Sequence, residues 1–145
     1  MDVKGGFMHN FHEYLYKYGL HDCRLDDILF ENGNIVFCFH SGVYRLNSVG
    51  KEIERTAACR MTVEFNEKCP LEICDHIEIN QILHRKIKEI NCHEFIENVK
   101  KFKFDIDINY YSYFCNTVLL KGYINNGKYE IVISEVKKVG FTFVE

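Results

Sequence analysis

Two Asn-Gly dipeptides, Asn32-Gly33 and Asn126-Gly127, are each flanked by segments rich in aliphatic and aromatic residues. Asn-Gly is a preferred centre for a type I′ turn because both central residues need a positive φ, and this turn joins two antiparallel strands. We therefore expect one hairpin from residues 25–31 and 34–40 and another from residues 117–125 and 129–136. Neighbouring strands joined by short turns favour antiparallel pairing over a doubly wound parallel sheet.

Further segments show the two-residue alternation of half-buried strands. In residues 57–65, every second side chain from Cys59 to Phe65 is apolar. Residues 104–110 alternate in the same way, and Phe104, Ile106, Ile108 and Tyr110 are expected to share one apolar face. Further strands are expected at residues 42–46, 71–79, 82–90 and 140–144, although residues 82–90 also fit a helix.

Two segments have the period of amphipathic helices. The first covers residues 7–18. The second covers residues 92–102 and follows Asn91, which can cap the helix, while Glu94 three residues later fits a capping box. The predicted buried stripe of this second helix consists of Cys92, Phe95, Ile96, Val99 and Phe102.

These elements predict an α+β fold. We expect a curved, mainly antiparallel sheet of about eight strands, with two helices packed on one side and a curvature that approaches a half-barrel. A length of 145 residues fits a single domain over residues 1–145. A second interpretation is a pair of related halves, residues 1–66 and 90–145, because a helix followed by an Asn-Gly hairpin occurs in each.

Charge and composition limit the classes of partner and compartment. The net charge of −3 leaves no basic excess to neutralise phosphates, so we expect no nucleic-acid binding. The sequence has no apolar run of about 20 residues, so we expect no membrane association. Seven cysteines without a recognisable secretion signal favour reduced thiols in the cytoplasm. The bias towards Lys, Asn and Ile suggests a bacterial source.

Cysteine and histidine are frequent, with seven of each, but they match no standard metal motif. A zincin helix needs a second His four residues after the first, and the residues at that spacing from His12 and His93 are Tyr16 and Glu97. The Asp105, Asp107 and Asn109 series resembles the start of a calcium loop, but the glycine that the loop requires is replaced by Tyr110. We interpret these three residues as one face of a strand.

Two Cys-x-His pairs, Cys38 with His40 and Cys74 with His76, lie on predicted strands. Residues two apart on a strand point to the same side, so each pair presents both side chains on one face. If the strands were neighbours, the four residues could form a Cys2His2 zinc site. Alternatively, a Cys beside a His and a carboxylate could be an activated nucleophile of an enzyme. We expect that the two pairs do not meet and that no cofactor is bound.

The function expected from these observations is non-enzymatic binding of a protein partner, or self-association, in the bacterial cytoplasm. Toxin-neutralising immunity proteins are similar in size and composition, and no motif supports the comparison further. Candidate contact residues are His12, Tyr16, Tyr111 and Tyr113, because tyrosine is enriched at interfaces. The first alternative is the metal or thiol site, and the second is a small-ligand pocket between the sheet and the helices.

Overall fold

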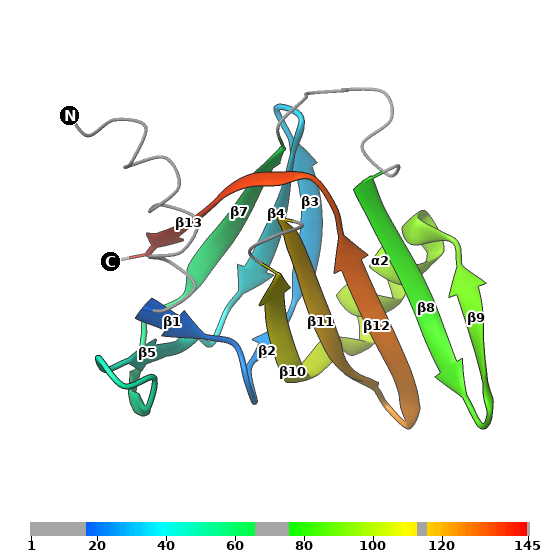
Figure 1. Ribbon diagram of the computed structural model, residues 1–145, viewed down its shortest axis with the longest axis horizontal. Coiled ribbons are helices and arrows are strands. Elements are labelled where there is room, and N and C mark those ends of the chain that lie inside the picture. The colour runs from blue at the N-terminus through cyan, green and yellow to red at the C-terminus, as the bar shows by residue number, and fades with distance from the viewer. Residues whose placement is uncertain (1–16, 66–75, 113–115, 145) are drawn as a thin grey trace.

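The computed structural model describes residues 17–65, 76–112 and 116–144. This part of the chain forms three antiparallel sheets and one helix (Figure 1). The predicted α+β fold with two helices on one curved eight-stranded sheet is therefore wrong, because the chain is mostly β and its strands are divided among three sheets. Residues 7–16 of the first predicted helix lie outside the described residues, and Tyr18, which ends that segment, belongs to a strand.

The largest sheet has six strands. In spatial order they are β2 (Arg24–Leu25), β10 (Phe104–Ser112), β11 (Thr117–Ile124), β12 (Gly127–Ile133), β8 (Ile77–Leu83) and β9 (Lys86–Ile90). Residues 82–90 were expected to form a strand, although they also fit a helix. They are extended, but they span the end of β8, a turn at His84 and Arg85, and β9.

The second sheet has four strands and the third has three. The four-stranded sheet contains β13 (Val136–Phe143), β7 (Cys59–Phe65), β4 (Asn34–Phe39) and β3 (Asp27–Glu31), in that order. The small sheet contains β1 (Tyr18–Gly19), β5 (Tyr44–Leu46) and β6 (Glu52–Arg55). The predicted face of β7 is confirmed, since Cys59, Met61, Val63 and Phe65 are all buried.

Within the described residues, two short connections take the chain from the six-stranded sheet to the four-stranded sheet. Asp26 separates β2, in the six-stranded sheet, from β3, in the four-stranded sheet. Ser134 and Glu135 separate β12 from β13, and Figure 1 shows β13, in red, running from the end of β12 across the top of the molecule to β7. The prediction of a single sheet is wrong. Residues 25–31, for example, were expected to form one continuous strand, but they are divided between β2 and β3, which belong to different sheets.

Helix α2 (Cys92–Phe102) closes the core between the two larger sheets, where it contacts β3, β8 and β11 (Figure 1). Its predicted cap is confirmed, because the Asn91 side chain accepts a hydrogen bond of 3.0 Å from the backbone N–H of Glu94. Phe95, Ile96 and Val99 are buried as predicted, whereas Phe102 at the end of the stripe is 49% exposed.

The first predicted hairpin is confirmed and the second turn is displaced by one residue. Asn32 and Gly33 have φ values of 54° and 77° and join β3 to β4. In the second hairpin, Ile124 pairs with Gly127, so the two loop residues are Asn125 and Asn126. This register places Tyr129 opposite Gly122, where the larger side chain has room beside a residue that lacks one.

Candidate functional site

The first Cys-x-His pair lies at the end of β4. Cys38 is buried between neighbours on both sides, since it pairs with Asp27 of β3 and Arg60 of β7. His40 follows the strand, and its side chain is largely exposed. Its Nδ1 atom lies 3.8 Å from Oδ2 of Asp26, which also accepts a hydrogen bond of 2.7 Å from the His40 backbone N–H.

The structure does not bring His76, the described member of the second pair, to the first pair. Cys74 lies outside the described residues, and the ring of His76 stacks on Phe65 with 4.5 Å between ring centroids. Phe65 ends β7, whereas Phe39, next to His40, pairs with Cys59 at the start of β7. Six residues of extended strand separate these ends by about 20 Å. The structure therefore places His76 far from Cys38 and His40.

The three buried thiols of Cys23, Cys38 and Cys59 have raised pKa values. Burial raises the pKa of Cys23 and of Cys59 from about 9 to about 11, and it also raises the pKa of Cys38. The Cys23 thiol donates to the backbone carbonyl of Gly19 over 3.6 Å. An activated nucleophile needs the opposite shift, because the thiolate is the reactive form. In the described ranges, no three His, Cys, Asp or Glu side chains are grouped so that they could hold a metal ion.

The raised thiol pKa values predict a loss of stability at alkaline pH. Below pH 9 the thiols are protonated in both states, but between pH 9 and 11 they ionise first in the unfolded chain, which favours unfolding. The free energy of unfolding should therefore fall across this window by up to about 2–3 kcal/mol for each thiol. Urea unfolding of the wild type and Cys59→Ala at pH 8 and pH 10.5 measures this.

The measurement at pH 8 on the same two proteins is the control for this experiment. At pH 8 the difference between wild type and Cys59→Ala reports only the packing lost with the side chain. We expect the pH-dependent loss to be smaller in the variant by about 2 kcal/mol. An equal loss in both proteins would show that Cys59 does not contribute to alkaline unfolding.

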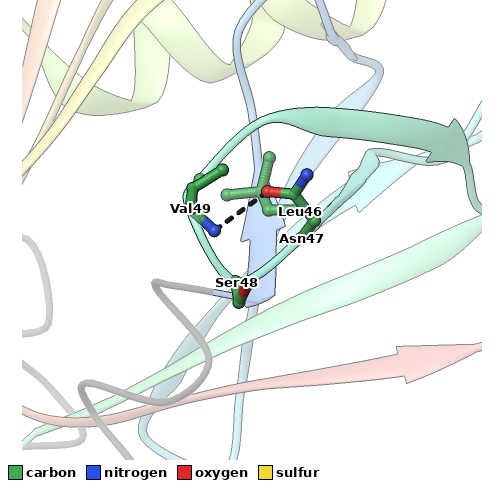
Figure 2. A pocket seen from close by; sticks show the side chains of 5 residues that line it. Leu46, Asn47, Ser48 and Val49 are labelled. Carbon is green, nitrogen blue, oxygen red and sulfur yellow. Dashed lines mark hydrogen bonds between the residues drawn. The ribbon is translucent and has the colours of Figure 1, made fainter.

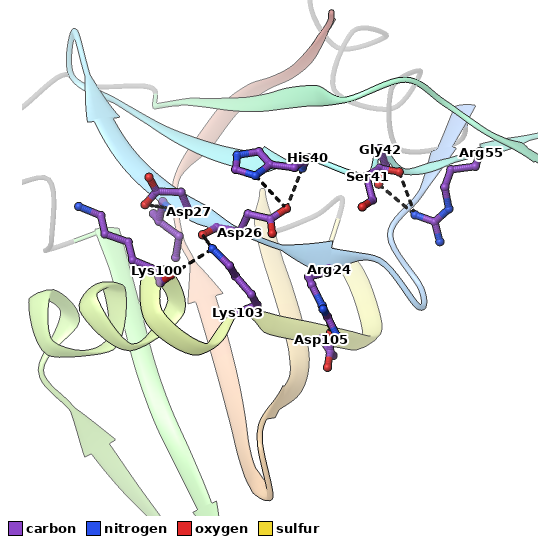
Figure 3. A network of polar contacts seen from close by, with 11 residues as sticks. Arg24, Asp26, Asp27, His40, Ser41, Gly42, Arg55, Lys100, Lys103 and Asp105 are labelled. Atoms are coloured by element: carbon purple, nitrogen blue, oxygen red, sulfur yellow. Dashed lines mark hydrogen bonds and ion pairs between the residues drawn. The ribbon is translucent and has the colours of Figure 1, made fainter.

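Asp26 is the centre of a polar network at the crossing between the two larger sheets (Figure 3). Its side chain is 9% exposed, and its backbone N–H donates to Cys38 O over 2.8 Å. The ammonium of Lys103 donates to the backbone carbonyls of Asp26, at 3.4 Å, and Lys100, at 3.0 Å. These contacts hold β2, β4 and the end of α2 together, which gives the network a structural role.

A surface pocket of about 310 Å³ lies at the loop between β5 and β6 (Figure 2). It is lined by Leu46, Asn47, Ser48, Val49 and Gly50. The Asn47 side-chain oxygen accepts hydrogen bonds from the backbone N–H groups of Val49 and Lys51, so the loop itself uses this acceptor. The small-ligand pocket predicted between the sheet and the helices would lie at another position from this loop pocket, and it stays a prediction.

One face of the six-stranded sheet points away from α2, and we call it the outer face. Side chains that are opposite each other in the ladder form three rows across β10, β11, β12, β8 and β9. The rows are Tyr110, Leu119, Val132 and Glu78; Ile108, Lys121, Glu130, Asn80 and Glu89; and Asp105, Tyr123, Lys128, Ile82 and Ile87. Two rows rich in apolar side chains thus flank a mainly polar row.

Polar contacts organise the middle row. The Asn80 side-chain amide donates to Glu78 over 2.9 Å and to Glu130 over 3.2 Å. The other carboxylate oxygen of Glu130 lies 3.9 Å from the ammonium of Lys121. Because Asn80 is only 7% exposed and bonds to both carboxylates, it fixes their positions on the sheet.

A β-bulge at Asp107 creates the exposed part of this face. Ile106 pairs with Gly122 and Ile108 with Lys121, so Asp107 is an extra residue in β10. A bulge redirects the side chains that follow it. Phe104 and Ile106 are buried, whereas Ile108 is 48% and Tyr110 61% exposed. The predicted common apolar face of residues 104–110 is therefore wrong beyond Ile106.

Among the described residues, Tyr110 and Tyr123 are the exposed tyrosines of the outer face. Neither is one of the contact residues predicted from the sequence, and those residues stay a prediction. Of the predicted contact residues, His12, Tyr16 and Tyr113 lie outside the described residues, and Tyr111 pairs with Val118 in the ladder of β10 and β11. No sequence signal marks the bulge, because the alternation of residues 104–110 continues through it.

Comparison of the chain with protein-family models, with curated proteins and with solved structures finds no match. Among the residues that the structure describes, no helix has the length and apolar character needed to cross a bilayer.

Proposed function

We propose that this chain is a non-enzymatic protein-binding module whose contact surface is the outer face of the six-stranded sheet. The observation that carries the proposal is the bulge at Asp107, which leaves Ile108 and Tyr110 exposed beside Leu119. Contiguous exposed apolar side chains with polar neighbours are typical of interaction sites.

The residue types of the outer face suit this role. Its most exposed large side chains are Ile87, Ile108, Tyr110 and Tyr123. Tyrosine supplies a large contact area with a polar end, and it is enriched at interfaces. The row of charged and amide side chains between the apolar rows gives a partner a defined register, because charges fix orientation more than they add affinity.

We place this activity in the cytoplasm of a bacterium. The thiols of Cys23, Cys38 and Cys59 are free and buried, which suits a reducing compartment. Their raised pKa values favour the unreactive thiol form and support binding over thiol catalysis. The bias towards Lys, Asn and Ile supports the bacterial source.

The proposal is tested with a tagged bait recovered from the native cell. The double variant Ile108→Ser with Tyr110→Ser removes exposed side chains only, so its fold and melting temperature should be close to the wild type. We expect recovery of the partner, including untagged copies of this chain, to fall at least tenfold, since loss of apolar anchors costs more than about 1.4 kcal/mol.

The matched control is Ile53→Ser on β6 of the small sheet, where the isoleucine is 55% exposed. It removes the same kind of side chain from another surface and should leave partner recovery unchanged. Equal recovery with the wild type and the double variant would contradict the outer face as the binding surface.

A further inference from the structure

Strand β9 forms one edge of the six-stranded sheet, and among the described strands it pairs with β8 alone (Figure 1). Its residues from Lys86 to Glu89 are exposed, and Ile90 is half-buried, so most of the strand is uncovered on both faces. An edge strand presents a row of backbone N–H and C=O groups that a further strand can use.

The register with β8 decides which backbone groups are open. Leu83 and Lys86 flank a two-residue loop, so they form a hydrogen-bonded pair. Hydrogen-bonded and non-hydrogen-bonded pairs alternate along an antiparallel ladder. Ile87 and Glu89 are therefore in non-hydrogen-bonded pairs, and their N–H and C=O groups point away from β8. These two residues offer both donors and acceptors to a further strand.

The charges of β9 oppose pairing with the same strand of a second copy. A two-fold axis at Lys88 would place this lysine opposite its own copy, and an axis at Ile87 would place Lys86 opposite Lys88. An axis at Glu89 would place two glutamates opposite each other. Like charges directly opposite each other destabilise a strand pair, so the edge disfavours self-pairing through its open groups.

The basic residues of β9 favour an acidic partner. Lys86 and Lys88 lie on one face of the strand, and their partners on β8 are the uncharged Leu83 and Gln81. Neither lysine forms an ion pair within the part of the chain that the structure describes. Carboxylates on an added strand would be complementary to this pair of charges, which selects among partners.

We propose that the edge of β9 is a second binding site, which adds one antiparallel strand of a protein partner with carboxylates at alternate positions. These carboxylates lie opposite Lys86 and Lys88. On the other face of the added strand, an apolar side chain lies opposite Ile87 and a cation lies opposite Glu89. Backbone hydrogen bonds supply the affinity of such a site, and the alternate side chains supply its specificity.

An NMR titration of the purified full chain tests this site with an N-acetylated, C-amidated hexapeptide, TKEVET. In antiparallel register its glutamates lie opposite Lys86 and Lys88, its valine opposite Ile87 and its lysine opposite Glu89. We expect saturable shifts of the Ile87 and Glu89 amide signals. The dissociation constant should be on the order of 1 mM or below, because a short edge forms few bonds.

Reversing the charges identifies the recognition. The double variant Lys86→Glu with Lys88→Glu should bind TKEVET at least about fivefold more weakly than the wild type does. It should bind TKKVKT, in which lysines replace both glutamates, at least about fivefold more tightly than it binds TKEVET. The matched control is Lys128→Glu, which changes an exposed charge on β12 and should leave TKEVET binding unchanged.

A backbone variant tests the edge directly. The N–H of Ile87 points to the open edge, where proline is tolerated, so Ile87→Pro should keep the fold and weaken TKEVET binding at least about fivefold. Absence of saturable shifts up to about 5 mM peptide would overturn the inference. Equal binding by the wild type and either the charge-reversed variant or Ile87→Pro would also overturn it. Ile108 and Tyr110 take no part in this site, so these results leave the proposed function standing.

Discussion

Replacing Gly42 with alanine should lower the free energy of unfolding by about 3–5 kcal/mol. Gly42 has a φ of 78°, a left-handed conformation that costs other residues about 1–2 kcal/mol. A Cβ atom there would lie 2.2 Å from the backbone oxygen of Thr56 and 2.7 Å from that of Ala57. Urea unfolding measures the loss.

The Thr56 backbone cannot move aside without further cost. Its N–H donates to the carbonyl of Val43 over 2.7 Å, and its hydroxyl accepts from the Val43 N–H over 3.0 Å. Arg55 also donates to the carbonyl of Gly42 (Figure 3). These bonds extend the ladder of β5 and β6 beyond the pair Tyr44 and Arg55, so a displaced Thr56 would disturb the small sheet.

The matched control for Gly42→Ala is Gly50→Ala. Gly50 has a similar φ of 82°, but a Cβ atom added there meets nothing within 4 Å. The free energy of unfolding of this variant should fall only by the cost of the left-handed backbone conformation, about 1–2 kcal/mol. If the two variants lost the same stability, contact with Thr56 would not be the cause of the effect.

Replacing Gly122 with alanine should cost about 3 kcal/mol and displace β10. The added Cβ atom would lie 2.2 Å from the backbone oxygen of Asp105 and 2.9 Å from the ring of Phe104. Gly122 pairs with Ile106 immediately before the bulge, so the strand that must move is the one that exposes Ile108. Thermal and urea unfolding measure the loss.

Gly140→Ala on β13 is the control for this substitution. The position meets nothing within 4 Å, so alanine should be neutral or stabilise the fold by up to about 1 kcal/mol through the unfolded state. Comparable losses at both positions would mean that any side chain on these strands is unfavourable and that the close approach of Asp105 has no special role.

Local features of the fold could be predicted from the sequence because they depend on neighbouring residues. Asn91 caps α2, and Asn32 with Gly33 forms the first turn, since each residue meets a conformational need within four positions along the chain. The second turn shows the limit of this reasoning. Asn126-Gly127 has the right residues, but pairing along the whole strand places the loop at Asn125.

Features that depend on distant residues could not be predicted. The division into three sheets requires the pairing of Arg24 with Asp105, about 80 residues away, and no local pattern contains that information. The same holds for the candidate surface. Ile108 and Tyr110 continue the alternation of Phe104 and Ile106, and only the ladder with β11 shows that Asp107 is an extra residue.

The pairing of early strands with late strands in the two larger sheets has a consequence for the timing of folding. β7 pairs with β13 on one side and β2 pairs with β10, so each of these strands from the first half of the chain needs a partner from the second half. Loop-closure entropy must be lost before such distant pairings form, which makes folding slow. During synthesis, the ladder between β7 and β13 cannot be completed until Phe143 has emerged from the ribosome. The nascent chain therefore carries open strand edges through most of its translation, and it should depend on chaperones that shield such edges until the last strand is released.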